Sequence, residues 1–325
     1  MTKVKNVAGI DISKKFFDVC MIVNGEYQQK KFSNDQQGIK AVSEWLAKDA
    51  HCVMEVTGVY YLRLALYLQQ HDFAVSVVNP LVIKRFSQMR LIRAKTDKAD
   101  AKMIALYAIA EQPDLWTAPH KYAVTLQQLD AIDEQLGKQH TALANQLEAF
   151  TQSGMMEKET KQFLLKSIKS ISQQRKHIEK KIEELIQKYH GEMMQHLTSI
   201  PGLGKKTAAM LIVISDGFKK FESSKQLCAY IGLSPRIYES GSSIKGKSKV
   251  CKMGMSRVRA LLYVCAWSAK RYNNACRELY ERLLAKGKPK KQALIAVAHK
   301  ILKQAFAIAL NREMFNSNYA KNICL

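Results

Sequence analysis

The chain has 325 residues, of which 51 are Lys or Arg and 28 are Asp or Glu, so its formal net charge is +23 at pH 7. Hydrophobic residues make up 47% and Gly and Pro number only 15 and 6, which excludes a disordered, collagen-like or linker-dominated chain. Residues 1–200 carry 27 basic and 22 acidic side chains, whereas residues 201–325 carry 24 and 6. Such a basic surface attracts polyanions, so nucleic acid is the first expected partner, ahead of anionic lipid.

The seven cysteines are scattered and include no Cys-x-x-Cys pair, which argues against a zinc site or a disulfide framework. Apolar runs such as 208–214 are far shorter than the ~20 residues that span a bilayer. The first residues contain no signal-peptide core. We therefore expect a reduced, cytoplasmic protein with no membrane partner.

Residues 1–115 are predicted to form an α/β domain. Asn24-Gly25 predicts a tight hairpin, because both residues tolerate positive φ. Apolar patterning predicts strands at 7–12, 16–23, 26–32, 52–56 and 75–78, and helices at 34–46, 60–70 and from 80 to about 110. Three strands, a helix, a strand, a helix, a strand and a last helix is the order of a RuvC-like (ribonuclease-H-like) fold.

Four carboxylates are expected to meet in this domain. Asp11 and Glu55 end the first and fourth strands, which are neighbours in that fold, and Asp97 and Asp100 share one helix face. Like charges at close range raise one another's pKa, and divalent cations remove that cost. Hard oxygen ligands favour Mg²⁺, with Mn²⁺ as a substitute, and two such ions can grip a phosphodiester. The alternative is that the Asp pair caps a helix and Glu55 is an exposed strand end.

Basic residues precede the Asp pair and could hold a nucleic-acid backbone beside the metals. They could equally form an ordinary solvated face. They are Lys84, Arg85, Arg90, Arg93 and Lys95.

Residues 116–192 are predicted to form a long antiparallel coiled-coil hairpin, broken at Gly154. Arms of ~26–30 residues would reach roughly 40–45 Å. The hairpin is either internal scaffolding or a dimerisation arm. Its repeating positions are Leu129, Leu136, Leu143 and Phe150 in the first arm, and Leu164, Ile168, Ile171, Arg175, Ile178, Ile182, Leu185 and Tyr189 in the second.

Residues 193–325 are predicted to be mostly helical, with helices near 256–272 and 290–310 and a Ser-, Gly- and Lys-rich loop at 239–254. Pro-Gly-x-Gly at 201–204 is typical of a helix-hairpin-helix, whose backbone N–H groups bind phosphate. Gly202, Gly204, Lys205 and Lys206 would then contact nucleic acid. The alternative is a tight turn between packed helices.

Four motifs, agreeing in order and spacing over almost the whole chain, carry a resemblance to a known family. They are GIDISKK at 9–15, EVTGVY at 55–60, KTDKADA at 95–101 and YIGLSPRIYESG at 230–241. Together they resemble the DEDD insertion-sequence transposases related to the Piv invertase, a family described as bridge-RNA-guided serine recombinases.

The resemblance implies a RuvC-like domain and a C-terminal transposase domain joined by a coiled coil. Asp11, Glu55, Asp97 and Asp100 match the family's Mg²⁺-binding tetrad, and Ser240 matches its nucleophile, which forms a covalent 5′-phosphoserine link. It also implies donor and target DNA as substrates, a structured guide RNA, and dimers that assemble into a tetramer with the tetrad of one subunit beside the serine of another. A bacterial, nucleoid-associated protein follows from the same likeness.

Local chemistry alone does not single out Ser240. Its loop carries basic residues that could offset phosphate charge, but a serine hydroxyl is a poor nucleophile without a base or a metal. The loop would otherwise be read as flexible. These basic residues, predicted to bind nucleic acid, are Arg236, Lys245, Lys247, Lys249 and Lys252.

Two other functions stay open. A hydrolytic RuvC-like structure-specific endonuclease would use the tetrad to activate water, with Ser240 incidental. A non-catalytic nucleic-acid-binding scaffold would use only the hairpin motif and the coiled coil.

Overall fold

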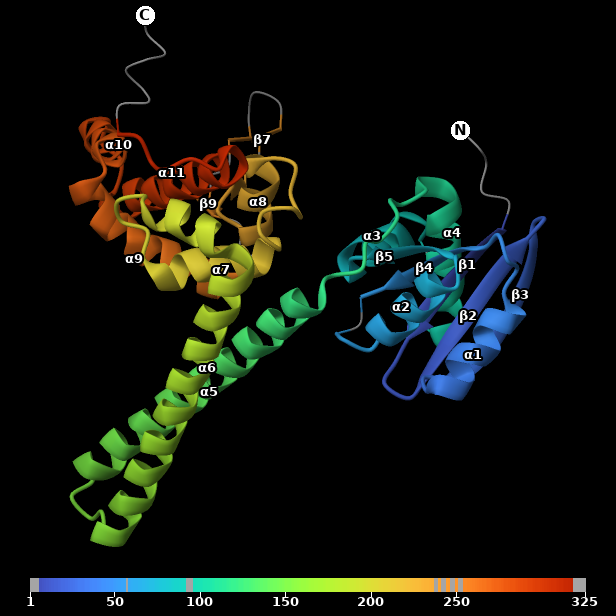
Figure 1. Ribbon diagram of the computed structural model, residues 1–325, viewed down its shortest axis with the longest axis horizontal. Coiled ribbons are helices and arrows are strands. Elements are labelled where there is room, and N and C mark those ends of the chain that lie inside the picture. Colours follow the sequence, from blue (N-terminus) through green and yellow to red (C-terminus); the bar gives the residue numbers. More distant parts are fainter. Residues whose placement is uncertain are drawn as a thin grey trace, which may run out of the picture. The chain divides into compact units, whose positions relative to one another are not determined.

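The computed structural model describes residues 6–56, 58–91, 96–236, 239–240, 244–245, 249–250 and 254–317. It divides the chain into two compact units, Met1–Pro119 and His120–Leu325 (Figure 1). The first unit is a mixed sheet covered by helices, and the second consists largely of helices.

The first unit is built on five strands in the order β3-β2-β1-β4-β5. The strands β1 (Asn6–Ile12), β2 (Phe16–Val23) and β3 (Glu26–Ser33) are antiparallel neighbours, and β4 (His51–Glu55) and β5 (Ala74–Val78) continue the sheet parallel to β1. The five predicted strands and their order along the chain are confirmed to within one residue. The two-residue turn at Asn24 and Gly25, with φ of 50° and 89°, fixes the register of β2 against β3.

Four helices complete this unit, namely α1 (Gln36–Trp45), α2 (Leu62–Gln70), α3 (Pro80–Met89) and α4 (Asp97–Glu111). The predicted first helix starts later than expected, because Asp35 rather than Asn34 caps it by accepting a 2.9 Å hydrogen bond from the Gly38 amide. The helical segments predicted between 80 and about 110 are two helices, since α3 ends at Met89 and Thr96 caps the start of α4.

Alternating residues send side chains to opposite faces of this sheet. Ile10, Phe17 and Val19 belong to a core shared with Leu64 and Leu68 of α2, whereas Val7, Cys20 and Ile22 pack with residues of α4. Gly9 lies on the α4 side of β1, where a Cβ atom would collide with the Ala101 carbonyl and the Ala105 amide. The absent side chain lets α4 cross β1 in backbone contact.

The second unit begins with the long hairpin of α5 (Lys121–Gln152) and α6 (Lys158–Thr198). Both arms exceed the predicted length, with 32 and 41 residues, and α6 is the longer because it continues through a kink at His190 (φ −141°). At its base the hairpin joins the core of the unit through Leu126, Ile186 and Leu197. The hairpin and the helical body therefore share one hydrophobic core.

The body of this unit contains α7 (Lys205–Ser215), α8 (Ser224–Ile231), α9 (Ser256–Tyr272), α10 (Asn274–Ala285) and α11 (Lys290–Asn311). The segment predicted as a plain loop also contains two short ladders: β6 (Pro235–Arg236) pairs with β9 (Lys249–Val250), and β7 (Glu239–Ser240) with β8 (Ile244–Lys245). By length and composition α11 could cross a membrane, but it is a core helix, with Leu294, Val297 and Ile301 fully buried.

Candidate active site

Asp11 lies near the end of β1 on the face that α4 covers, two residues after Gly9. Glu55 ends β4, which runs parallel to β1, so both carboxylates lie at the same end of the sheet. The chain direction of two parallel strands thus brings together residues that are 44 positions apart in the sequence.

The other two predicted carboxylates, Asp97 and Asp100, lie in the first turn of α4. Thr96 caps this helix, its hydroxyl accepting a 3.2 Å hydrogen bond from the Ala99 amide while its carbonyl accepts from the Asp100 amide at 2.8 Å. The cap shows that the Asp pair is not itself the N-cap. Acidic side chains at this position also interact favourably with the helix dipole.

The electrostatics of Asp11 reflect these acidic neighbours. Its pKa is raised from 3.8 to about 6, first by burial and then by the charges of Asp100, Glu55 and Asp97, with a smaller effect from Asp18. Among the described residues, the charges that act on this half-buried carboxyl are all carboxylates. All its neighbours in this set offer hard oxygen atoms, the donors that Mg²⁺ and Mn²⁺ prefer.

The set fits a divalent cation by chemistry and by charge. Among the described residues, however, no three His, Cys, Asp or Glu side chains form a closed ligand group. Asp97, whose side chain is 72% exposed, would have to turn toward Asp11 to share an ion with it.

The sequence-predicted basic residues near this end are only partly described. Arg90 follows α3, and its guanidinium lies 4.9 Å from the centre of the Phe86 ring. Arg93 and Lys95 lie outside the described residues. The predicted contact of these three with nucleic acid remains a prediction.

Ser240 lies in the second unit, in β7, where it pairs with Ile244 of β8. Arg236, Lys245 and Lys249 lie in β6, β8 and β9, while Lys247 and Lys252 fall outside the described residues. The two ends of this segment meet, because a Cβ atom on Gly254 would lie 2.7 Å from the carbonyl oxygens of Tyr230 and Ile231. The candidate serine therefore lies in a short ladder between two chain segments, at 230–231 and 254, that contact each other.

The Pro-Gly-x-Gly turn joins α6 to α7, and its two glycines differ in surroundings. Gly202 (φ +98°) packs on α9, where a Cβ atom would lie 2.6 Å from the Ala269 backbone. Gly204 is open and precedes the first turn of α7. Lys206 forms a 2.6 Å ion pair with Glu179 of α6. Close packing against α9 explains why residue 202 is a glycine. The space beside Gly204 is open, so the predicted phosphate contact at Gly204 and Lys205 stays a prediction.

Two groups of charged side chains escaped the sequence analysis. One is the pair of Asp18 and Lys31 beside Asp11. The Asn24-Gly25 turn could have revealed this pair, because it sets the register that places Lys31 of β3 opposite Asp18 of β2. The other is a lock in the second unit, in which the buried Asp133 of α5 accepts 2.8 Å bonds from Arg175 of α6 and Arg257 of α9. Arg257 also donates to Asp130 at 2.8 Å.

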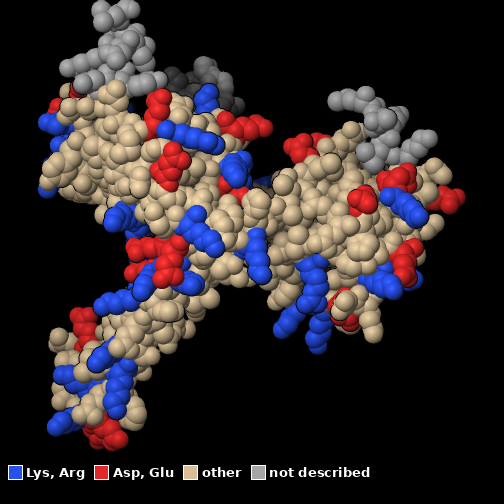
Figure 2. All heavy atoms as spheres, in the orientation of Figure 1, with Lys and Arg blue, Asp and Glu red and all other residues tan. Residues whose placement is uncertain are grey.

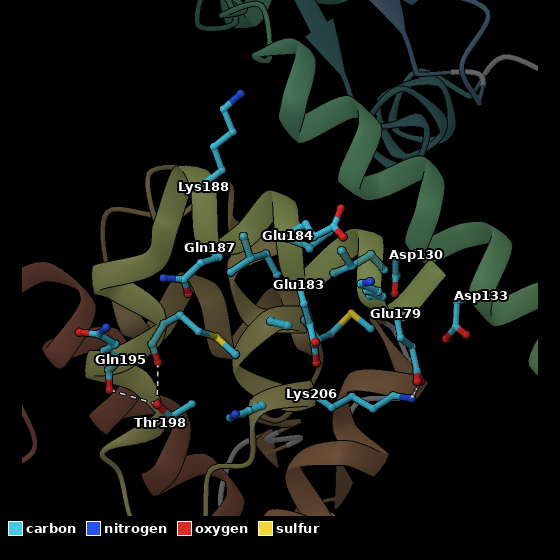
Figure 3. A pocket seen from close by; sticks show the side chains of 18 of the residues that line it. Asp130, Asp133, Glu179, Glu183, Glu184, Gln187, Lys188, Gln195, Thr198 and Lys206 are labelled. Atoms are coloured by element: carbon cyan, nitrogen blue, oxygen red, sulfur yellow. Dashed lines mark hydrogen bonds and ion pairs between the residues drawn. The ribbon is translucent and has the colours of Figure 1, made fainter. Parts of the chain in front are cut away.

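This lock borders a cavity of about 850 Å³ between the hairpin and α7, whose lining side chains are drawn in Figure 3. The lining combines apolar residues, such as Ile182, Ile186 and Met210, with charged ones, such as Glu179, Glu183 and Lys206. Figure 2 shows side chains of both charges along the hairpin surface as well.

Comparison with known proteins gives a consistent picture. Residues 8–155 match a family model described as a transposase, of the DEDD type named after IS110, and residues 194–281 match one described as the IS116/IS110/IS902 transposase family. The chain is 33% identical to the pilin gene-inverting proteins of Moraxella lacunata and Moraxella bovis, over 96% of its length and 98% of theirs. It is 25% identical to the IS1328 transposase of Yersinia enterocolitica, over 79% of this chain and 82% of that one.

Proposed function

This chain belongs to the IS110 family of transposases, enzymes that recombine DNA, and from that membership we propose that it is an RNA-guided recombinase that cuts and rejoins DNA through a covalent phosphoserine intermediate. The first unit would then be a RuvC-like, ribonuclease-H-like domain, and the 201–204 turn a helix-hairpin-helix. The observation that carries the proposal is the surroundings of Asp11, a half-buried carboxyl whose pKa is raised by burial and by the charges of four further acids.

Asp11, Glu55, Asp97 and Asp100 would hold Mg²⁺ or Mn²⁺. When bound, such an ion stabilises charge on the attacking and leaving oxygens of a phosphodiester. The protein's own contribution is to hold Asp11 and Glu55 on neighbouring strand ends and the Asp pair on a capped helix turn. The backbone elements are thus in place, and Asp97 would still have to turn its side chain toward Asp11 to share an ion.

The proposed nucleophile is Ser240. Its hydroxyl oxygen forms a bond to the DNA phosphorus, the bond from phosphorus to the 3′ oxygen breaks, and the hydroxyl proton is passed on to that leaving oxygen. The products are a 5′-phosphoserine and a free 3′-hydroxyl. A 3′-hydroxyl from another strand then attacks the phosphoserine and restores Ser240. The number of phosphoester bonds is conserved in both steps, so rejoining requires no ATP.

Guidance by a structured RNA would leave sequence choice to base pairing, while the protein grips nucleic-acid backbones. The excess of 18 positive charges in residues 201–325 supports such a grip. Subunits would assemble so that the tetrad of one lies beside the serine of another.

The test is a covalent-adduct assay with Mg²⁺, guide RNA and labelled DNA. Wild type should yield a protein–DNA adduct that Ser240→Ala abolishes and that Ser242→Ala, a serine in the same loop, retains. Asp11→Asn should lower adduct formation at least about 100-fold, as expected when a metal ligand of a phosphoryl-transfer site is lost. Cleavage that survives Ser240→Ala but not Asp11→Asn would establish the hydrolytic nuclease instead. Nucleic-acid binding without cleavage under any condition would establish the scaffold.

Mixing two inactive variants tests the shared active site. If tetrad and serine come from different subunits, Ser240→Ala mixed with Asp11→Asn regains one intact site in each mixed pair. Random pairing then gives about a quarter of wild-type adduct. No recovery after confirmed subunit exchange would place tetrad and serine in one chain.

A further inference from the structure

A row of three charged residues crosses the sheet beside the candidate site. Asp11 of β1 pairs in register with Asp18 of β2, which pairs with Lys31 of β3. Residues that face one another across neighbouring strands point to the same side of the sheet. That side is the one covered by α4, because Gly9 of β1 packs on α4 and Cys20 of β2 belongs to the core that includes α4 residues.

Lys31 contacts two carboxylates from different elements. Its Nζ lies 3.4 Å from Asp18 Oδ2 and 4.0 Å from Asp97 Oδ2. The Asp18 side chain is only 8% exposed, whereas that of Lys31 is 50% exposed. The ammonium group also lies 5.3 Å from the centre of the Phe16 ring. A nearly buried aspartate is costly without a partner, so this pair differs from a freely solvated surface contact.

The strand β3 holds α4 at two further points. The Gln29 side chain donates a 3.1 Å hydrogen bond to the carbonyl of Lys98, and the Lys102 ammonium lies 4.2 Å from the centre of the Tyr27 ring. Residues 27, 29 and 31 alternate along β3 and face the same way. The first turn of α4, which carries Asp97 and Asp100, therefore rests on one face of this strand.

We propose that Lys31 is a resident counter-ion of the carboxylate cluster, anchored by Asp18, that it positions Asp97, and that it competes with the divalent cation for the cluster. The competition with metal rests on the proposed function, whereas the counter-ion role does not. Lys31 is a positioning residue, since it acts on the metal-binding carboxylates and not on DNA.

Electrostatics fixes the expected direction of the effect. The charges of Asp18, Glu55, Asp97 and Asp100 act on Asp11, and Lys31 contacts Asp18 and Asp97. Removing its charge increases the repulsion in the metal-free protein and removes the repulsion between Lys31 and an incoming cation. The metal-free protein should therefore be less stable, and the cation should bind more tightly.

The experiment uses the full-length chain and thermal unfolding, with and without Mg²⁺. Lys31→Met keeps the aliphatic stem and should lower the metal-free Tm by about 2–4 °C. The midpoint of the Mg²⁺-dependent rise in Tm should move to about fivefold lower concentration. Lys31→Arg should restore both values. The matched control is Lys30→Met, the neighbouring lysine on the opposite sheet face, 5.2 Å from the Phe32 ring centre; it should change the Mg²⁺ midpoint less than twofold.

A double-mutant cycle keeps the two proposals separable. Asp18→Asn combined with Lys31→Met should recover most of the lost metal-free Tm, because an uncompensated buried charge is removed. Additive effects would overturn the counter-ion role, and equal midpoint shifts in Lys30→Met and Lys31→Met would overturn the competition with the cation. If the cycle shows coupling but Mg²⁺ leaves the wild-type Tm unchanged, the counter-ion role stands and the metal-dependent function falls. Should Lys31→Met fail to fold, the double variant and Lys31→Arg provide the same comparisons.

Discussion

The two units contain charged clusters that differ in balance. In the first unit, four carboxylates raise the pKa of Asp11, and Lys31 contacts two of them, Asp18 and Asp97. In the second, Asp130 and Asp133 are matched by Arg175 and Arg257, with three contacts of 2.8 Å. Paired charges of this kind stabilise one structure. A cluster with more negative than positive charges is instead stabilised when it binds an external cation. The comparison therefore contrasts a structural lock with the candidate metal site.

The largest expected effect is the loss of the lock. Asp133→Ala leaves Arg175 and Arg257 without their shared acceptor, so the free energy of unfolding should fall by about 2–4 kcal/mol. Urea denaturation measures the change. The control is Glu134→Ala, which removes an exposed pair with Lys138 on the same helix and should cost less than about 0.5 kcal/mol. Equal losses in the two variants would show that the lock is no more than surface pairing.

Removing the negative charge of Asp11 from the first cluster should instead raise the free energy of unfolding. The pKa of Asp11 is raised to about 6, so the folded state binds protons more tightly than the unfolded state. In metal-free buffer the contribution of the protonated Asp11 carboxyl to folding stability is fully present below pH 4. It is lost as the pH rises through about 6. Asp11→Asn should therefore stabilise the protein at pH 7.5 by about 1–2 kcal/mol, after allowance for its partial exposure.

The same variant supplies the pH test. The difference in stability between wild type and Asp11→Asn, measured by calorimetry without metal, should shrink between pH 7 and pH 4. Mg²⁺ should raise the Tm of wild type and not of the variant. A variant less stable than wild type at pH 7.5 would contradict the unbalanced cluster.

The smallest expected effect on stability concerns Lys206, which pairs with Glu179 although both side chains are about half exposed. Lys206→Met should change the free energy of unfolding by less than about 0.5 kcal/mol. If Lys206 contacts a phosphate, as the 201–204 motif predicts, the variant should show a weaker salt dependence of nucleic-acid affinity. The slope of log affinity against log salt concentration should become shallower by about one. An unchanged slope would leave Lys206 as part of the hairpin packing only.

Patterning in the sequence predicted the sheet well, because β1, β2 and β4 are apolar strands ended by turn residues such as Asn24 and Gly25. It could not predict the two-residue ladders around Ser240, since such short strands carry no periodic signal. Asp133 interrupts the apolar repeat of α5, and only the fold supplies its arginine from α9, 124 positions away.

The sequence predicted the acidic residues of the candidate site but did not predict that a lysine, Lys31, contacts two carboxylates beside them. Asp11 and Glu55 were predictable because they end apolar strands, and Asp97 with Asp100 because they share a helix face. Lys31 lies in a strand whose exposed, polar sequence resembles any solvated edge. Its importance depends on which helix lies over that edge, and this information is tertiary.

The contact of Gly9 with α4 has a genetic consequence. A Gly codon becomes an Ala codon by one nucleotide change, and the added methyl group would collide with backbone atoms of Ala101 and Ala105. Because Asp97 and Asp100 are carried on the same rigid helix, one copying error would displace both acids at once without touching either codon. A mobile element can thus be silenced by a mutation at a position that bears no chemistry.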